Sequence, residues 1–219
     1  MILYNTLLGV ASGAAMVLVA ALIRALGQRT QIVTAGWVAA MLALGVVVTF
    51  LGAAMAVTWP LKAKPQANIL FGEPTLLLGV LLLVGAWLMW SRSSFFVISD
   101  DEDAARLTRL VTPLAWLVSV LGLILLVCAF TIVTLNAIGS APPQEPISGS
   151  LPAGVENALV GAMYLLAALG TLPAPWVVRD LGGGLAKSAS WVLTIGGVLV
   201  LLYSAMNYYT HIGELLKGP

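Results

Sequence analysis

Residues 110–137 read LVTPLAWLVSVLGLILLVCAFTIVTLNA and contain no Asp, Glu, Lys or Arg. About 20 apolar residues, each rising about 1.5 Å in an α-helix, cross the hydrocarbon core of a bilayer, which is about 30 Å thick. This stretch is longer than that minimum, so it predicts a transmembrane helix. Its cysteine, Cys128, is the only one in the chain, which excludes a disulfide framework within the chain.

Five further segments of similar composition lie on either side of this stretch. They cover residues 2–23, 33–61, 73–90, 158–178 and 190–212. Of all 219 residues, 60% are hydrophobic and 9% are charged, whereas soluble domains are about 45–50% apolar and about 25% charged. The formal charge of +1 offers no basic face for nucleic acid. The sequence therefore predicts an all-α integral membrane protein, with residues 1–219 forming one domain of six transmembrane helices.

Polar residues and a proline indicate where two of the helices begin. Glu73 and Pro74 stand at the start of the third span, where the helix dipole favours a carboxylate and the fixed φ of proline suits a first turn. Ser99 and Glu102 have the spacing of a capping box, and Glu102 is four residues before Arg106. This pattern predicts a short surface helix that leads into the fourth span.

The distribution of positive charge predicts the orientation in the membrane. Six spans place both termini on one side, and seven of the ten Lys and Arg residues fall in the first, third and fifth connections. Connections rich in Lys and Arg stay in the cytoplasm. We therefore expect a multi-pass protein of the cell membrane with both termini outside. No basic region precedes the first span, so we expect that span to be retained rather than cleaved.

The chain shows a pattern that either of two arrangements explains. A tryptophan stands near the start of each even-numbered span, at separations of 79 and 75 residues, and a polar residue stands near the start of each odd-numbered span. Three similar helical hairpins would produce this pattern. Independent anchoring of each helix at the membrane interface would produce it as well. Gly9 and Gly13 form a small-residue stripe, for which we expect another helix of the same chain as the partner.

The candidate functional residues lie near the outer ends of the odd-numbered spans. Five polar side chains there are candidates to converge as contacts for a cation, a proton or a polar ligand: Asn5, Asn68, Glu73, Glu156 and Asn157. Ionisable residues in a membrane are costly and therefore carry a functional hypothesis. In the alternative interpretation, Glu73 and Glu156 only cap helix starts. No charged residue lies deep in a span, which disfavours a proton-coupled pump.

Other residues with chemical potential favour structural interpretations. Haem between transmembrane helices usually needs two axial ligands, and the chain has one histidine, His211, at a span end. The thiol of Cys128 is most simply a small hydrophobe in an apolar span. Glycines 182–184 indicate a turn, because no strand adjoins them. We expect no catalytic residue, no cofactor and no metal site, and hence no enzyme.

Three motifs carry a family resemblance: YNTLL at 4–8, TWPL at 58–61 and NILFGEP at 68–74. Through them the chain resembles a family of uncharacterised multi-helix membrane proteins from actinobacteria and archaea, which is known as a domain of unknown function. The resemblance covers the first hundred residues best and implies no activity. In size and in lack of chemistry the chain is also similar to accessory subunits of the actinobacterial cytochrome bcc–aa3 respiratory supercomplex.

These observations support a leading hypothesis and two alternatives. The first is a non-catalytic accessory subunit of a larger membrane complex, with a respiratory supercomplex as the first candidate host. Its partners would be other integral membrane subunits and membrane lipids, and no nucleic acid. The second is a small-molecule or ion carrier that uses the outer polar cluster. The third is a membrane enzyme acting on lipid or quinone, which needs paired polar residues that the sequence does not reveal.

Overall fold

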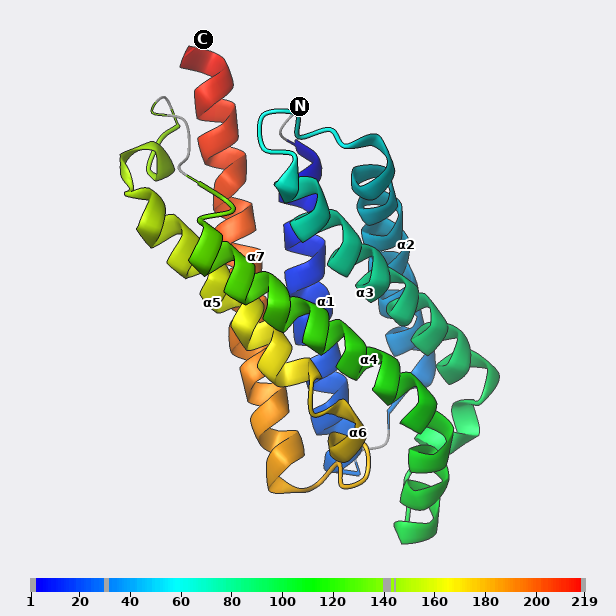
Figure 1. Ribbon diagram of the computed structural model, residues 1–219. Helices are drawn as coiled ribbons and strands as arrows, with labels where there is room; N and C mark the ends of the chain where they lie inside the picture. Colours follow the sequence, from blue (N-terminus) through cyan, green and yellow to red (C-terminus); the bar gives the residue numbers. More distant parts are fainter. Residues whose placement is uncertain (1–2, 30–31, 140–142, 144, 218–219) are drawn as a thin grey trace.

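The computed structural model describes residues 3–29, 32–139, 143 and 145–217. Every regular element in these residues is a helix (Figure 1). The long helices are α1 (Leu3–Gly27), α2 (Thr34–Thr58), α3 (Gln66–Ser91), α4 (Asp101–Leu135), α5 (Ala153–Thr171) and α7 (Gly184–Lys217). The short ones are η1 (Ser93–Phe96), η2 (Ser148–Ser150) and α6 (Ala174–Val177). In these residues six spans are long and apolar enough to cross a membrane, which confirms the predicted fold class.

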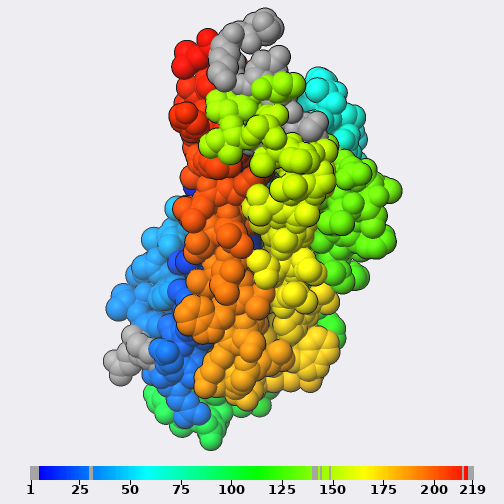
Figure 2. All heavy atoms as spheres, turned by 90° about the vertical axis from the view of Figure 1, so that its left-hand side faces the viewer, coloured from blue at the N-terminus to red at the C-terminus, as the bar shows by residue number. Residues whose placement is uncertain are grey.

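The long helices pack most extensively as three pairs, α1 with α7, α2 with α3 and α4 with α5. In Figure 1 α4 runs diagonally across the view, and in Figure 2 α7 and α5 lie side by side. The start of α1 and the end of α7 lie at the same end of the molecule (Figure 1), which is called the terminal end below. The other end is called the opposite end. Three similar hairpins would pair α1 with α2, α3 with α4 and α5 with α7. These helices are in contact, but none of these pairs is among the most extensive ones.

Glycines allow the closest helix pairs to approach each other. A Cβ atom on Gly13 would lie 2.6 Å from the backbone oxygen of Gly197 in α7, and one on Gly9 would overlap the hydroxyl of Ser204. In the α2–α3 pair, a Cβ atom on Gly52 would lie 2.6 Å from a backbone nitrogen of α3. Such close approach is how helices associate in lipid, where packing replaces the hydrophobic effect. The partner of the Gly9 and Gly13 stripe is therefore a helix of the same chain, as predicted.

The third helix begins earlier than predicted. Pro74 lies inside α3, two turns after its first residue, so the prediction that Glu73 and Pro74 open this helix is wrong. Proline has no N–H, and the carbonyl of Leu70, four residues earlier, loses its usual donor. Tyr164 of α5 donates its hydroxyl hydrogen to this carbonyl at 2.7 Å. A neighbouring helix thus satisfies the group that Pro74 releases, which allows the helix to continue through the proline.

The fourth helix joins the predicted surface helix and the fourth span without interruption. Its N-cap is Asp100 rather than Ser99, which corrects the predicted capping box by one residue. The Asp100 side chain accepts a hydrogen bond from the N–H of Asp103 at 2.9 Å, and the Asp103 carboxylate accepts one from the N–H of Ser99 at 3.0 Å. This reciprocal pair satisfies two N–H groups, as a capping box does. The predicted pair of Glu102 and Arg106 is present at 2.9 Å.

Prolines divide the fifth span into α5 and α6. Pro173 lies between these helices and Pro175 lies inside α6, and neither can donate a backbone hydrogen bond. The hydroxyl of Ser119 in α4 donates to the carbonyl of Leu172 at 2.7 Å, so a side chain from another helix again satisfies backbone at a proline break. α7 then begins at Gly184, at the end of the predicted glycine turn.

Candidate functional site

Asn68, in the first turn of α3, holds the connection that precedes this helix. The side chain is completely buried. Its Oδ1 accepts a hydrogen bond from the N–H of Leu61 at 3.0 Å, and its Nδ2 donates to the carbonyls of Leu61 at 3.1 Å and Pro65 at 3.0 Å. The amide therefore ties the partly buried backbone groups of Leu61 and Pro65 to the start of α3.

Asn157, in the second turn of α5, does the same for the connection that follows α4. It is almost fully buried. Its Oδ1 accepts from the N–H of Ile138 at 3.0 Å, while its Nδ2 donates to the carbonyls of Gly139 at 3.3 Å and Ala153 at 2.7 Å. Both asparagines thus have the geometry of structural anchors. Each side-chain amide binds backbone groups of the connection before its own helix, and Asn157 also binds the first residue of α5.

Asn5 and Glu73 have different environments from the two anchoring asparagines. The Oδ1 atom of Asn5 is buried and has no hydrogen-bond partner among the described residues. Glu73 is exposed on α3, about 10 Å along the helix from its start at a rise of about 1.5 Å per residue. It lies near Cys128 of α4. Convergence of all five predicted residues on one ligand stays a prediction.

Glu156, in the first turn of α5, is buried and meets α7. The hydroxyl of Tyr203 donates to its Oε1 at a distance of 3.4 Å. Glu156 is 7% exposed, so bulk water does not solvate this carboxylate freely. Burial of a carboxylate is costly unless it is hydrogen bonded or paired with a positive charge. The tyrosine is one group that stabilises it.

A second buried carboxylate at the terminal end, Glu145, is not among the residues predicted from the sequence. Glu145 lies in the connection between α4 and α5, and its Oε1 is 3.0 Å from Nδ1 of His211 in α7. Their side chains are 5% and 14% exposed. The next residue, Pro146, packs against Gly213, so the loop rests on the end of α7. Figure 2 shows the described part of this loop in lime green against the red end of α7.

The two carboxylates belong to one polar region. Tyr203 lies near Glu145 as well as Glu156. The region therefore combines two buried carboxylates, one phenol and one imidazole, which we call the terminal polar cluster: Glu145, Glu156, Tyr203 and His211. Such a set can bind a proton or a cation, because carboxylates accept either. Among the described residues, no three His, Cys, Asp or Glu side chains are grouped so that they could hold a metal ion.

The sequence contained a weak signal for this cluster. His211 stands at a span end in the sequence, and the loop around Glu145, residues 141–152, is rich in proline, serine and glycine. Loops without periodicity give no indication of which helix they will contact. The pairing of Glu145 with His211 joins residues far apart in the chain, so local patterns did not predict it.

Together, these features define a class of protein. Six apolar helices, close glycine packing and a buried polar cluster at one end are those of a multi-pass helical membrane protein. A family model described as Protein of unknown function (DUF981) matches residues 1–214, and the chain belongs to this family. This result confirms the predicted membership in an uncharacterised family, and the match extends well beyond the first hundred residues. No curated protein and no solved structure matches the chain.

Proposed function

We propose that this protein is a non-catalytic integral membrane subunit that docks on a larger membrane complex through the outward face of α4. The exposure of this helix carries the proposal. In the most apolar stretch of α4, 22% is buried inside the bundle, whereas the buried share is 44% in the corresponding stretches of α1 and of the fifth span. Large exposed side chains follow each other at spacings of four, three, four and three residues: Trp116, Val120, Leu123, Val127 and Phe130.

This spacing supports a helix as the docking partner. Residues that alternate between three and four positions apart form a single stripe along an α-helix, and such a stripe is the seam that a second helix packs against. In a bilayer, helices associate through packing and polar contacts, because lipid tails are as apolar as the side chains. The stripe on α4, which we call the α4 seam, provides the packing contact.

Glu73 supplies a polar group beside the α4 seam. It is exposed on α3 near Cys128, which lies one residue after Val127 of the seam. A charged carboxylate that faces lipid is costly unless it reaches the interface or finds a partner. A Lys, Arg or hydrogen-bond donor on a docked helix would satisfy it. We infer that Glu73 contributes to recognition of the partner.

We further propose a host complex, a membrane and an orientation for the protein. A respiratory supercomplex is the first host to test, because its accessory subunits are similar in size and in their lack of chemistry. We place the protein in the cell membrane, with the terminal end outside. The distribution of Lys and Arg supports this orientation, since seven of the ten lie in the connections of the opposite end or in the helix ends beside them.

Affinity purification in a mild detergent, followed by mass spectrometry, tests the proposal. We expect stoichiometric membrane partners with the unaltered chain, and at least a tenfold loss of them in Leu123→Ala/Phe130→Ala at normal membrane abundance. The matched control is Leu42→Ala/Phe50→Ala on α2, since Phe50 and Phe130 are each 70% exposed. An equal loss of partners in the control, or purification of the unaltered chain alone, would contradict docking through α4.

The terminal polar cluster favours a second function, a carrier for cations or small cationic molecules. The observation behind it is the burial of two carboxylates, Glu145 and Glu156, around Tyr203. Flux of Na⁺ and K⁺ into proteoliposomes that contain the purified protein provides the test. A carrier would transport one of these cations and lose transport in Glu156→Gln. No flux above protein-free vesicles would contradict transport of either ion.

A further inference from the structure

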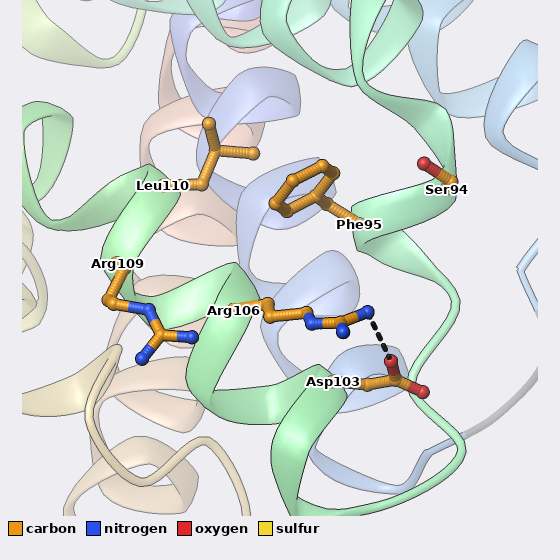
Figure 3. A pocket seen from close by; sticks show the side chains of 6 residues that line it. All are labelled: Ser94, Phe95, Asp103, Arg106, Arg109 and Leu110. Carbon is orange, nitrogen blue, oxygen red and sulfur yellow. Dashed lines mark ion pairs between the residues drawn. The ribbon is translucent and has the colours of Figure 1, made fainter.

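Two cavities at the opposite end of the bundle share one arginine. The first has a volume of about 460 Å³ and lies between η1 and the start of α4 (Figure 3). Its lining residues are Ser94, Phe95, Asp103, Arg106, Arg109 and Leu110. The second, of about 500 Å³, lies between the end of α1, α4 and the segment after α6. Arg109 lines both cavities.

Some of the arginines around these cavities form ion pairs with acidic side chains that the structure describes, and others do not. Arg106 is paired with Glu102 at 2.9 Å and with Asp103 at 3.9 Å. Arg29, in the second cavity, is paired with Asp101. Arg109 is exposed, and no described carboxylate lies within ion-pair distance of it. Its guanidinium therefore remains available to an external anion.

The second cavity holds additional charges of both signs. Arg179 and Asp180 lie on its lining with Arg29 and Asp101. The carboxylate of Asp101 is occupied by Arg29, so Asp180 is the acid that opposes Arg109 and Arg179 there. In the first cavity, Asp103 is directed at Arg106 (Figure 3). Among the described arginines of the two cavities, Arg109 and Arg179 are therefore the ones in no ion pair, and of these only Arg109 lines both cavities.

The walls of the first cavity are apolar above the arginines. Figure 3 shows Leu110 and Phe95 side by side, with Arg106 and Arg109 below them. Exposed tryptophans at the same end of the bundle, among them Trp90 and Trp116, indicate the depth of the membrane interface. A site at that depth with an apolar wall and a cationic floor matches a lipid whose chains lie against the wall and whose phosphate lies on the floor.

We propose that Arg109, with Arg106 beside it, binds the phosphate group of an anionic phospholipid at the opposite end of the bundle. An arginine offers paired N–H donors that fit two phosphate oxygens, so the contact is directional as well as electrostatic. Basic pockets between transmembrane helices on the cytoplasmic side are the usual sites for anionic headgroups. The site is independent of the α4 seam and of the terminal polar cluster.

Thermal unfolding of the purified, detergent-solubilised protein tests this inference. Three additives are compared: phosphatidylglycerol, phosphatidylcholine and inorganic phosphate. We expect phosphatidylglycerol to raise the midpoint of unfolding, and phosphatidylcholine to leave it unchanged. Inorganic phosphate carries the same chemistry without the acyl chains, so we expect it to have no effect at the same concentration. An equal shift with inorganic phosphate would contradict a lipid source.

Variants locate the site. Arg109→Gln should weaken phosphatidylglycerol binding at least tenfold by titration, while Arg92→Gln, an exposed arginine outside both cavities, should bind like the unaltered protein. Arg109→Lys keeps the charge but loses the paired donors, and we expect an intermediate affinity. If Arg109→Gln does not fold, Arg109→Lys decides between the alternatives. Unchanged affinity in Arg109→Lys, or an equal loss in Arg92→Gln, would overturn the assignment to Arg109.

Discussion

Removing one hydroxyl group tests how α3 tolerates its internal proline. Tyr164→Phe deletes the group that donates to the Leu70 carbonyl at 2.7 Å. The aromatic ring and its packing remain. Because Pro74 has no N–H, the Leu70 carbonyl then has no donor within its own helix. Leu70 is also buried. The variant therefore isolates the hydrogen bond between α5 and α3.

The expected cost follows from two bounds. A buried acceptor left without a partner costs about 1–3 kcal/mol in proteins generally. Hydrogen bonds between transmembrane helices contribute about 0.6 kcal/mol on average and about 1.7 kcal/mol at most. We expect a loss of about 1 kcal/mol in the free energy of unfolding, since Leu70 is buried but loss of the hydrogen bond exposes no charge.

The sharper test is a double-mutant cycle with Pro74→Ala. An alanine at this position restores an N–H that bonds to Leu70 within the helix, so Tyr164→Phe should cost less than half as much in that background. Unfolding in mixed micelles, followed by circular dichroism, measures all four proteins. Tyr209→Phe, an exposed tyrosine on α7, is the matched control and should be neutral. Equal costs of Tyr164→Phe with and without Pro74 would refute the reasoning.

The remaining predictions concern the loops and the orientation. Asn157→Ala should destabilise the protein by about 1–3 kcal/mol, because it leaves buried loop groups unpaired; thermal unfolding measures this, and a neutral result would contradict the anchoring role. Glu145→Gln should destabilise by a similar amount, because His211 loses its carboxylate partner, and faster proteolysis of the loop should accompany it. In whole cells that express the protein with Cys128 replaced, a membrane-impermeant thiol reagent should label Ser150→Cys but not Ser93→Cys. The reverse pattern would invert the proposed orientation.

The number and approximate position of the transmembrane helices followed from apolar length alone. The start of α3 did not, because Glu73 and Pro74 have the local features of a helix start. Whether Pro74 ends or merely interrupts a helix depends on Tyr164, which is distant in sequence and reaches it only in the folded bundle. The shift of the α4 cap by one residue is a smaller error, since Ser and Asp are both good N-caps.

The positions of several candidate polar residues near helix starts could be predicted from the sequence, but their contacts could not. The sequence placed Asn68, Asn157 and Glu156 near helix starts at one end, and the structure places them there. It gave no indication that the two asparagines bind their own connections. Glu145 and His211 were also missed as a pair, because a loop without periodicity does not reveal the helix it contacts.

The pairing of α1 with α7 has a consequence for the biogenesis of the protein. Of the described helices, α1 is synthesised first and α7 last, and the face of α1 that carries Gly9 and Gly13 packs against α7. During translation this face remains in contact with lipid or with the insertion machinery until the other helices have entered the membrane. Such a long-range contact delays completion of the fold. A chain arrested before α7 therefore lacks the helix that covers these glycines in the folded protein.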